Sequence, residues 1–382
     1  MTADLRPEEL VERAIAQTGL DDLGDVPFRE PLDVLTEALN REAKLEGTRV
    51  DEARGTLVAL LAKRLALVAD RKRFPEIADQ HVVAPIFIVG LPRTGSTLLH
   101  GLMGAAEGVR VPMFWEMVMP SPPPDAATFH TDPRIAQAQA IVDRMPEDLL
   151  RRHPVAATRP EQCNLLNDWS FIHQALLASF EIPTYRDWLY DADYGPAFEA
   201  HRRTLQHLQW RNPGQWVLKY PKHLIALDVL LATYPDARLV WTHRDPATVI
   251  PSVCSLTGYM RSPTPGFDPV RFGREWATFE EIVLRRGLDI RDTLVDADTR
   301  IHDLHYEDLM RDPVEAVAAI CTKFGVPFGE SSRAGVAQYI ADHPKTEHGE
   351  HRYTAEEFGL TRAGLQRRFG FYIDRFGVAT KT

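Results

Sequence analysis

Residues 90–97 read Gly-Leu-Pro-Arg-Thr-Gly-Ser-Thr, and a short apolar run, Ile86-Phe87-Ile88-Val89, comes directly before them. The next residues, Leu-Leu-His-Gly-Leu-Met over 98–103, can continue as a helix. Two glycines five apart between a strand and a helix, with hydroxyl residues where the helix opens, have the frame of a P-loop. The segment could also be a glycine turn that only joins the two elements. The strand, the helix and the two hydroxyls together favour a loop that binds an anion.

This loop departs from the version found in nucleoside triphosphatases, which reads G-x-x-x-x-G-K-[ST]. Here Ser96 stands at the lysine position, and the basic residue is Arg93, inside the loop. Backbone N–H groups around Thr94–Thr97 can still converge on an anion, and the helix N-terminus adds a favourable dipole. Because the lysine is missing and no clear Mg²⁺ carboxylate follows a later strand, the sequence argues against hydrolysis of ATP or GTP.

Strand and helix patterns alternate beyond the loop. Trp216-Val217-Leu218, the run 238–242 and the run 299–305 are further strand candidates, each followed by a helical pattern. This alternation predicts an α/β fold with a P-loop-like parallel sheet flanked by helices. In such sheets ligands bind at the carboxyl ends of the strands.

Two other regions are expected to be helical. Leu57, Leu61, Leu65 and Val68 share one helical stripe, so residues 1–80 are predicted to form an N-terminal helical cap. Residues 81–382 form the main domain, and a helical insertion at about 120–215 interrupts its alternation. The aromatic residues of this insertion are either helical core or the wall of an acceptor pocket.

Composition narrows the classes of function. The chain has 382 residues, with 54 acidic and 44 basic side chains and a net charge of −10, which disfavours general binding to nucleic acid or anionic membranes. Its three cysteines are far apart and predict neither a disulfide framework nor a zinc site. The N-terminus lacks the apolar core of a signal peptide, and no apolar run reaches the ~20 residues that span a bilayer. We therefore expect a cytoplasmic protein without an integral membrane segment; the oligomeric state is left open.

A second anion site is predicted after the run 238–242. Arg244 lies at the end of that strand, and Ser252 follows about two turns into the next helix. An arginine in this place can donate two parallel hydrogen bonds to a phosphate, and a serine can donate a third. An isolated arginine would more often form a surface ion pair, for example with Asp245.

Together these segments resemble the sulfotransferase family. The resemblance runs from about residue 85 to the C-terminus, and it rests on GLPRTGST, LKYPKHL, RDPATVIPS, Tyr306-Glu307-Asp308 and RYTAEEFGL in that order. It implies transfer of a sulfuryl group from 3′-phosphoadenosine-5′-phosphosulfate (PAPS) to a hydroxyl or amine of a small molecule. It also implies roles for matching positions. The 5′-phosphosulfate would be held by Arg93, Thr94, Gly95, Ser96 and Thr97. Arg244 and Ser252 would hold the 3′-phosphate, and Tyr306 would lie near the adenine.

Four residues are candidates for the chemistry. Arg93 and Lys219, which ends a predicted strand, could stabilise charge on the transferred group. The general base could be Glu116, whose apolar neighbours would raise its pKa, or His223, four residues after Lys219. Both could instead be structural, Glu116 in a salt bridge or at a helix start and His223 at a helix N-terminus. Glu116 is slightly favoured.

The run around Glu116 also bears on the acceptor. Methionine and aromatic residues over 113–119 make adaptable apolar walls, which favours an acceptor with an apolar body over a free sugar. The same residues could simply pack the core.

His343, His348 and His351, with Glu347 and Glu350, could suggest a metal site, but their spacing and the nearby Pro344 and Gly349 favour a solvated loop. The family resemblance implies that this loop closes over the nucleotide, where Lys345 or Arg352 could reach a phosphate. We therefore expect no metal. Two alternatives stay open: a kinase-like phosphotransferase and a nucleotide-binding module without catalysis.

Overall fold

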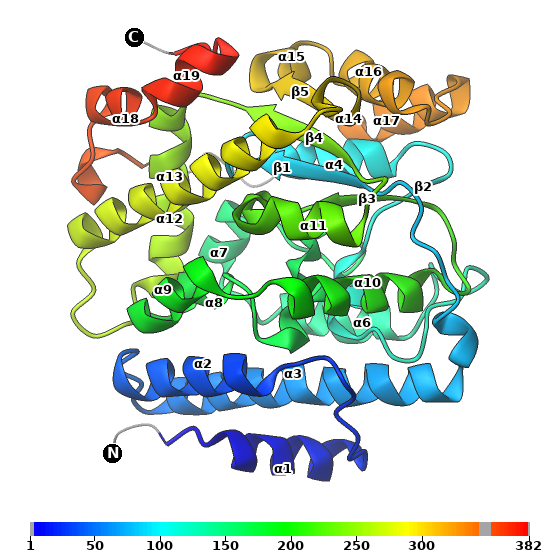
Figure 1. The fold of residues 1–382 in the computed structure, drawn as a ribbon, viewed down its shortest axis with the longest axis vertical. Helices are drawn as coiled ribbons and strands as arrows, with labels where there is room; N and C mark the ends of the chain where they lie inside the picture. The colour runs from blue at the N-terminus through cyan, green and yellow to red at the C-terminus, as the bar shows by residue number, and fades with distance from the viewer. Residues whose placement is uncertain (1–3, 344–352, 381–382) are drawn as a thin grey trace.

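A computed structural model describes residues 4–343 and 353–380, and it is a layered α/β structure (Figure 1). A five-stranded sheet has the order β2-β3-β1-β4-β5, and every pairing is parallel. The strands are β1 (Ile86–Gly90), β2 (Val109–Arg110), β3 (Gln215–Lys219), β4 (Arg238–His243) and β5 (Ile301–His305). The predicted fold class is confirmed.

The central strand β1 is buried on both faces because its side chains alternate between two cores. Ile86 and Ile88 pack in a core with helices α4 (Ser96–Gly104), α16 (Pro313–Phe324) and α17 (Glu330–Asp342). Phe87 and Val89 belong to the larger core on the other face. Helices on that side include α11 (Leu227–Thr233), α12 (Pro246–Arg261) and α13 (Pro269–Thr293). A continuously apolar strand is what burial on both faces requires.

The N-terminal helices are α1 (Pro7–Thr18), α2 (Arg29–Arg41) and α3 (Thr48–Arg73), and they lie together at the end of the molecule away from the sheet (Figure 1). Helix α1 begins with Pro7 and ends at Thr18, and its C-cap Gly19 has a φ of 69°, the left-handed conformation that glycine adopts without strain. On α3, Leu57, Leu61 and Leu65 are fully buried in the same core as Phe87.

The segment between β2 and β3 fills the space between these helices and the sheet (Figure 1). Its elements are α5 (Phe114–Val118), α6 (Arg134–Val142), α7 (Glu147–Arg152), η2 (Cys163–Leu166), η3 (Asp168–Ser170), α8 (Leu176–Ser179), α9 (Pro183–Asp191) and α10 (Gly195–Gln209). Trp169, Phe171, Phe180 and Tyr185 are buried, as expected for helical core.

Short elements complete the chain. They are η1 (Pro75–Ile77), η4 (Pro221–Ala226), α14 (Ala297–Arg300), α15 (Tyr306–Arg311), η5 (Glu356–Phe358), α18 (Arg362–Arg368) and α19 (Gly370–Phe376). Within the described ranges, no helix combines the length and the apolar character needed to cross a membrane.

Candidate active site

The anion loop joins β1 to α4 at the carboxyl edge of the sheet. Thr94 is completely buried, and its Oγ1 donates to the Leu91 carbonyl at 2.8 Å and lies 2.6 Å from Thr242 Oγ1 on β4. Thr94 thus fastens the loop to the neighbouring strand. Gly95 is the N-cap of α4 and has no side chain to occupy the first-turn N–H groups. These groups can therefore bind an anion.

The structure brings the two predicted anion segments together. Arg93 Nε donates to Ser252 Oγ at 3.2 Å, and Arg244 Nη1 donates to the Arg93 carbonyl at 2.8 Å. The Arg244 guanidinium lies 3.8 Å from the centroid of the Tyr306 ring. A Cβ at Gly95 would lie 3.1 Å from that ring, and the φ of Gly95 is 84°. Glycine is therefore required where Tyr306 approaches the loop.

Of the other loop residues, Ser96 is buried and Thr97 is exposed. Burial lowers the pKa of Arg93, and the charge of Arg244 lowers it further, while Tyr353 acts in the opposite direction. Arginine remains charged in proteins in spite of such shifts. Two arginine side chains within electrostatic range of each other favour a ligand with more than one negative charge.

Lys219 lies at the end of β3 and is 2% exposed. Burial lowers its pKa, the carboxylate of Glu161 raises it, and the charge of Arg93 lowers it. The Nζ atom is 3.9 Å from Glu161 Oε1. Lys219 thus lies within electrostatic range of Arg93 in the anion loop. This is expected, because Lys219 and the loop both lie at the carboxyl ends of parallel strands.

The sequence did not reveal His153 and Glu161. His153 Nε2 is 2.9 Å from Glu161 Oε2, and the Gln162 N–H donates to Glu161 Oε1 at 2.7 Å. Arg93 Nη1 donates to the carbonyl of Arg152, the neighbour of His153, at 3.3 Å. The histidine–carboxylate pair therefore lies between the anion loop and Lys219.

Charges around Glu161 keep it ionised. Burial would raise its pKa, but His153 and Lys219, with the Gln162 N–H, lower it to about 2. The histidine and the glutamate are eight residues apart in a segment without helical or strand periodicity. No spacing rule could therefore have paired them.

The structure places Glu116 in a buried ion pair, which is one of the structural roles expected for it. Its side chain is 0% exposed, Oε2 accepts from Arg110 Nη2, and Oε1 accepts the N–H of Met113 at 3.0 Å. Burial raises its pKa, as expected, while Arg110 opposes the rise. Because both oxygens are occupied inside the protein, this geometry favours an ion-paired helix cap over a general base.

The apolar run around Glu116 is also core. Phe114, Trp115 and Met117 are buried, and the first two pack against Ala138 and Val142 of α6. This run packs the core and does not line an open acceptor pocket, so it gives no support of its own to an apolar acceptor.

His223 lies in η4 and is 4% exposed. Its Nε2 is 3.1 Å from Cys163 Sγ, and burial lowers its pKa well below the ordinary value. Such a histidine is neutral but a weak proton acceptor, which weighs against His223 as the base.

The C-terminal histidine cluster is mostly outside the described residues. His348, His351, Glu347, Glu350, Lys345 and Arg352 all fall within 344–352. His343 is described, and its Nδ1 lies 2.9 Å from the Tyr339 carbonyl. Beyond the gap, Tyr353 lies within electrostatic range of Arg93.

Comparison with known proteins agrees with this geometry. A model of the sulfotransferase family matches residues 85–330, which include the anion loop, Lys219 and Arg244. The chain belongs to the sulfotransferase family. It is therefore a transferase that moves a sulfuryl group to a small acceptor, and the sequence-based prediction of its reaction is confirmed.

Several mycobacterial sulfotransferases are similar over most of the chain. The omega-hydroxy-beta-dihydromenaquinone-9 sulfotransferase Stf3 of Mycobacterium bovis is 29% identical over 78% of this chain and 76% of its own length. The crystal structure of sulfotransferase STF1 from Mycobacterium tuberculosis H37Rv is 31% identical, with a TM-score of 0.85 over 97% of this chain and all of that one. That of STF9 from Mycobacterium avium is 27% identical, with a TM-score of 0.90 over 99% of this chain and 98% of that one.

Proposed function

We propose that this sulfotransferase uses PAPS as donor and a hydroxyl group on a partly apolar molecule as acceptor. The observation that supports the donor is the convergence of Arg93, Lys219 and Arg244 beside the N-terminus of α4. The net charge of the chain is −10, yet these three cationic side chains lie at one edge of its sheet. PAPS carries negative charge at two separate positions, which suits two adjacent arginines.

The binding roles we propose are those that the family resemblance implies, and the positions of the residues support them. The first-turn N–H groups of α4, with Ser96, Thr97 and Arg93, hold the 5′-phosphosulfate. Arg244 and Ser252 hold the 3′-phosphate, and Tyr306 contacts the adenine. Thr94 acts indirectly, because its hydroxyl is committed to Leu91 and Thr242.

In the reaction, the acceptor oxygen forms a bond to sulfur while the bond from sulfur to the bridging phosphate oxygen breaks. The nucleotide 3′,5′-bisphosphate leaves with that electron pair. By analogy with phosphoryl transfer the transition state is loose, so that positioning and charge stabilisation dominate. Arg93 and Lys219 stabilise the charge that grows on the bridging oxygen. We propose that the reaction needs no Mg²⁺, because a sulfuryl group carries less charge than a phosphoryl group.

His153 is the general base that accepts the acceptor proton. A carboxylate can only accept hydrogen bonds, so the contact with Glu161 places the imidazole proton on Nε2. Nδ1 then presents a lone pair, and the side chain is 22% exposed. Glu161 is a positioning residue, because it fixes the tautomer of His153 and lies beside Lys219.

The preference for an apolar acceptor is supported by a relative. Stf3 is named for omega-hydroxy-beta-dihydromenaquinone-9. A hydroxylated lipid or phenol is therefore the acceptor class we propose for this chain. The kinase-like alternative is not favoured, because Ser96 replaces the lysine of the triphosphatase loop.

The test is a mass-spectrometric search of lipid and polar extracts incubated with enzyme and PAPS. We expect a product in the lipid extract that gains one sulfuryl group, and no such product with a Lys219→Met variant. Sulfated products found only among polar sugars would contradict the apolar acceptor. No sulfated product in either extract would contradict the activity.

A further inference from the structure

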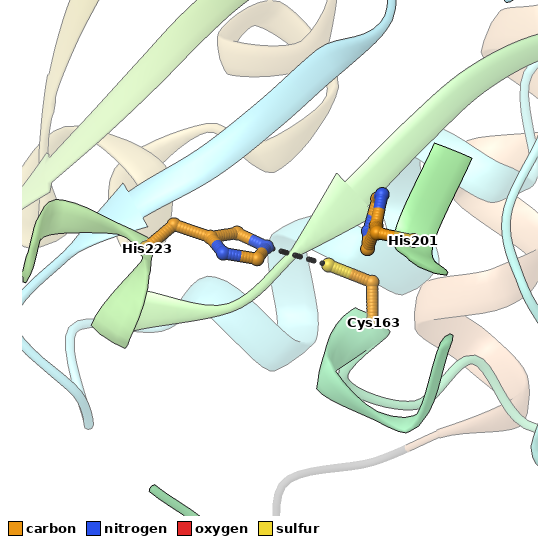
Figure 2. A group of neighbouring side chains, drawn as sticks. All are labelled: Cys163, His201 and His223. Carbon is orange, nitrogen blue, oxygen red and sulfur yellow. Dashed lines mark hydrogen bonds between the residues drawn. The ribbon is translucent and has the colours of Figure 1, made fainter. Parts of the chain in front are cut away.

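Cys163, His201 and His223 form a compact group beneath the sheet (Figure 2). They come from η2, α10 and η4, and their ligand atoms all lie within 4.8 Å of one another. Their exposed fractions are 0%, 0% and 4%. Because the three residues are widely separated in sequence, only the fold reveals them as a group.

His201 shows a second feature that points to a ligand. Its Nδ1 lies 2.8 Å from the Tyr234 hydroxyl, whereas its Nε2 is buried and has no hydrogen-bond partner among the described residues. Leaving a buried polar nitrogen unpaired costs about 1–3 kcal/mol. Histidines that bind metals usually have one ring nitrogen on the metal and the other hydrogen-bonded to an oxygen. In His201 the contact between Nδ1 and the Tyr234 hydroxyl is the hydrogen bond to oxygen, which leaves Nε2 for a metal.

We propose that Cys163 Sγ, His201 Nε2 and His223 Nε2 bind a single zinc ion. Zinc is borderline-soft and accepts thiolate and imidazole together, at about 2.3 Å from sulfur and 2.0–2.1 Å from nitrogen. The Cys163 Sγ and His223 Nε2 atoms are 3.1 Å apart, and the ligand atom of His201 lies within 4.8 Å of both residues' ligand atoms. Binding displaces the thiol proton to solvent and leaves a thiolate on zinc.

The zinc would have a structural role, not a chemical one. Cys163 is two residues after Glu161, which lies beside Lys219. Fixing Cys163 to α10 and η4 would therefore hold Glu161, and through it His153, at the carboxyl edge of the sheet. The burial of all three ligands also means that the ion would enter during folding. The proposal does not depend on the identity of the donor or the acceptor.

The test measures zinc by elemental mass spectrometry in protein purified from zinc-supplemented cells. We expect about one zinc per chain, retained on dialysis, and a loss of more than tenfold in Cys163→Ser. Cys254→Ser is the matched control, because Cys254 is equally buried but lies on α12, outside the group. It should keep its zinc.

Two further measurements make the test decisive. Protein refolded with Co²⁺ should show thiolate-to-metal charge-transfer absorption, which His201→Gln should weaken or abolish even if Cys163→Ser does not fold. A folded wild-type chain that binds neither zinc nor cobalt would overturn the proposal and leave a hydrogen-bonded thiol and two imidazoles. Zinc retained equally by Cys163→Ser and His201→Gln would overturn it as well.

Discussion

Replacing Arg244 with alanine should weaken binding of the bisphosphate nucleotide without weakening that of ADP. Arg244 is proposed to contact the 3′-phosphate, and a hydrogen bond to a charged group is worth about 1.5–3 kcal/mol. At about 1.4 kcal/mol for each factor of ten, Arg244→Ala should raise the Kd of 3′-phosphoadenosine-5′-phosphate by about 10- to 150-fold. ADP lacks the 3′-phosphate, so its Kd should change little.

Isothermal titration calorimetry with both nucleotides separates two roles of Arg244. The same side chain donates to the Arg93 carbonyl, so its loss could also disturb the anion loop. A distorted loop would weaken ADP and the bisphosphate equally, and that result would refute the 3′-phosphate role. Arg333→Ala is the control, because Arg333 is a half-exposed arginine on α17 that pairs with Glu315. It should leave both Kd values unchanged.

Four further predictions concern the proposed base His153, the buried Glu116, the need for Mg²⁺ and the pH dependence of stability. His153→Ala should cut turnover by ~10²–10⁴-fold and leave the nucleotide affinity unchanged, and added imidazole should restore part of the turnover. The control variant His81→Ala, at an exposed histidine, should stay active. Full activity of His153→Ala would exclude His153 as the base. Glu116→Gln leaves Arg110 buried and unpaired, so urea unfolding should show a loss of about 3–5 kcal/mol. The exposed-pair control Glu315→Gln should lose no more than about 1 kcal/mol, and an equally small loss in Glu116→Gln would contradict the buried ion pair. Initial rates should be the same in EDTA and in Mg²⁺, and a rate that needs Mg²⁺ would argue for a metal-dependent mechanism. Burial would raise the pKa of Asp303, but Arg291 and His243 lower it overall. The ionised carboxylate therefore stabilises the fold at pH values above its unfolded pKa of about 4, and this stabilisation is lost as the pH falls. Asp303→Asn should therefore destabilise the chain at pH 7 and progressively less as the pH falls below about 4, and a loss of stability that does not change with pH would contradict the linkage.

The sequence could place at one edge of the sheet those candidate residues that lie a short distance from a strand end. Arg93, Lys219, Arg244 and Tyr306 each lie at or just after the end of a strand, and parallel strands place their carboxyl ends at one edge. The apolar runs made the strands recognisable, so fold and anion loop could both be inferred. The same argument places the N-terminus of α4 at that edge.

Other parts of the site could not be predicted, for physical reasons. His153 and Glu161 meet in a segment without regular periodicity, and Cys163 meets His201 only after the insertion folds. The role of Glu116 could not be decided from the sequence, because an apolar surrounding fits both a base with a raised pKa and a buried ion pair. Its partner, Arg110, lies on the two-residue edge strand β2, which has no recognisable sequence pattern.

The most direct test of the central claim is a label-transfer measurement with two donors. Purified enzyme is incubated with a hydroxylated lipid quinone and either ³⁵S-labelled PAPS or ATP labelled in its γ-phosphate, and label in the extracted lipid is counted. The proposed mechanism predicts that ³⁵S appears in the lipid, that no label comes from ATP, and that Lys219→Met abolishes the transfer. Label from ATP in place of PAPS would contradict it.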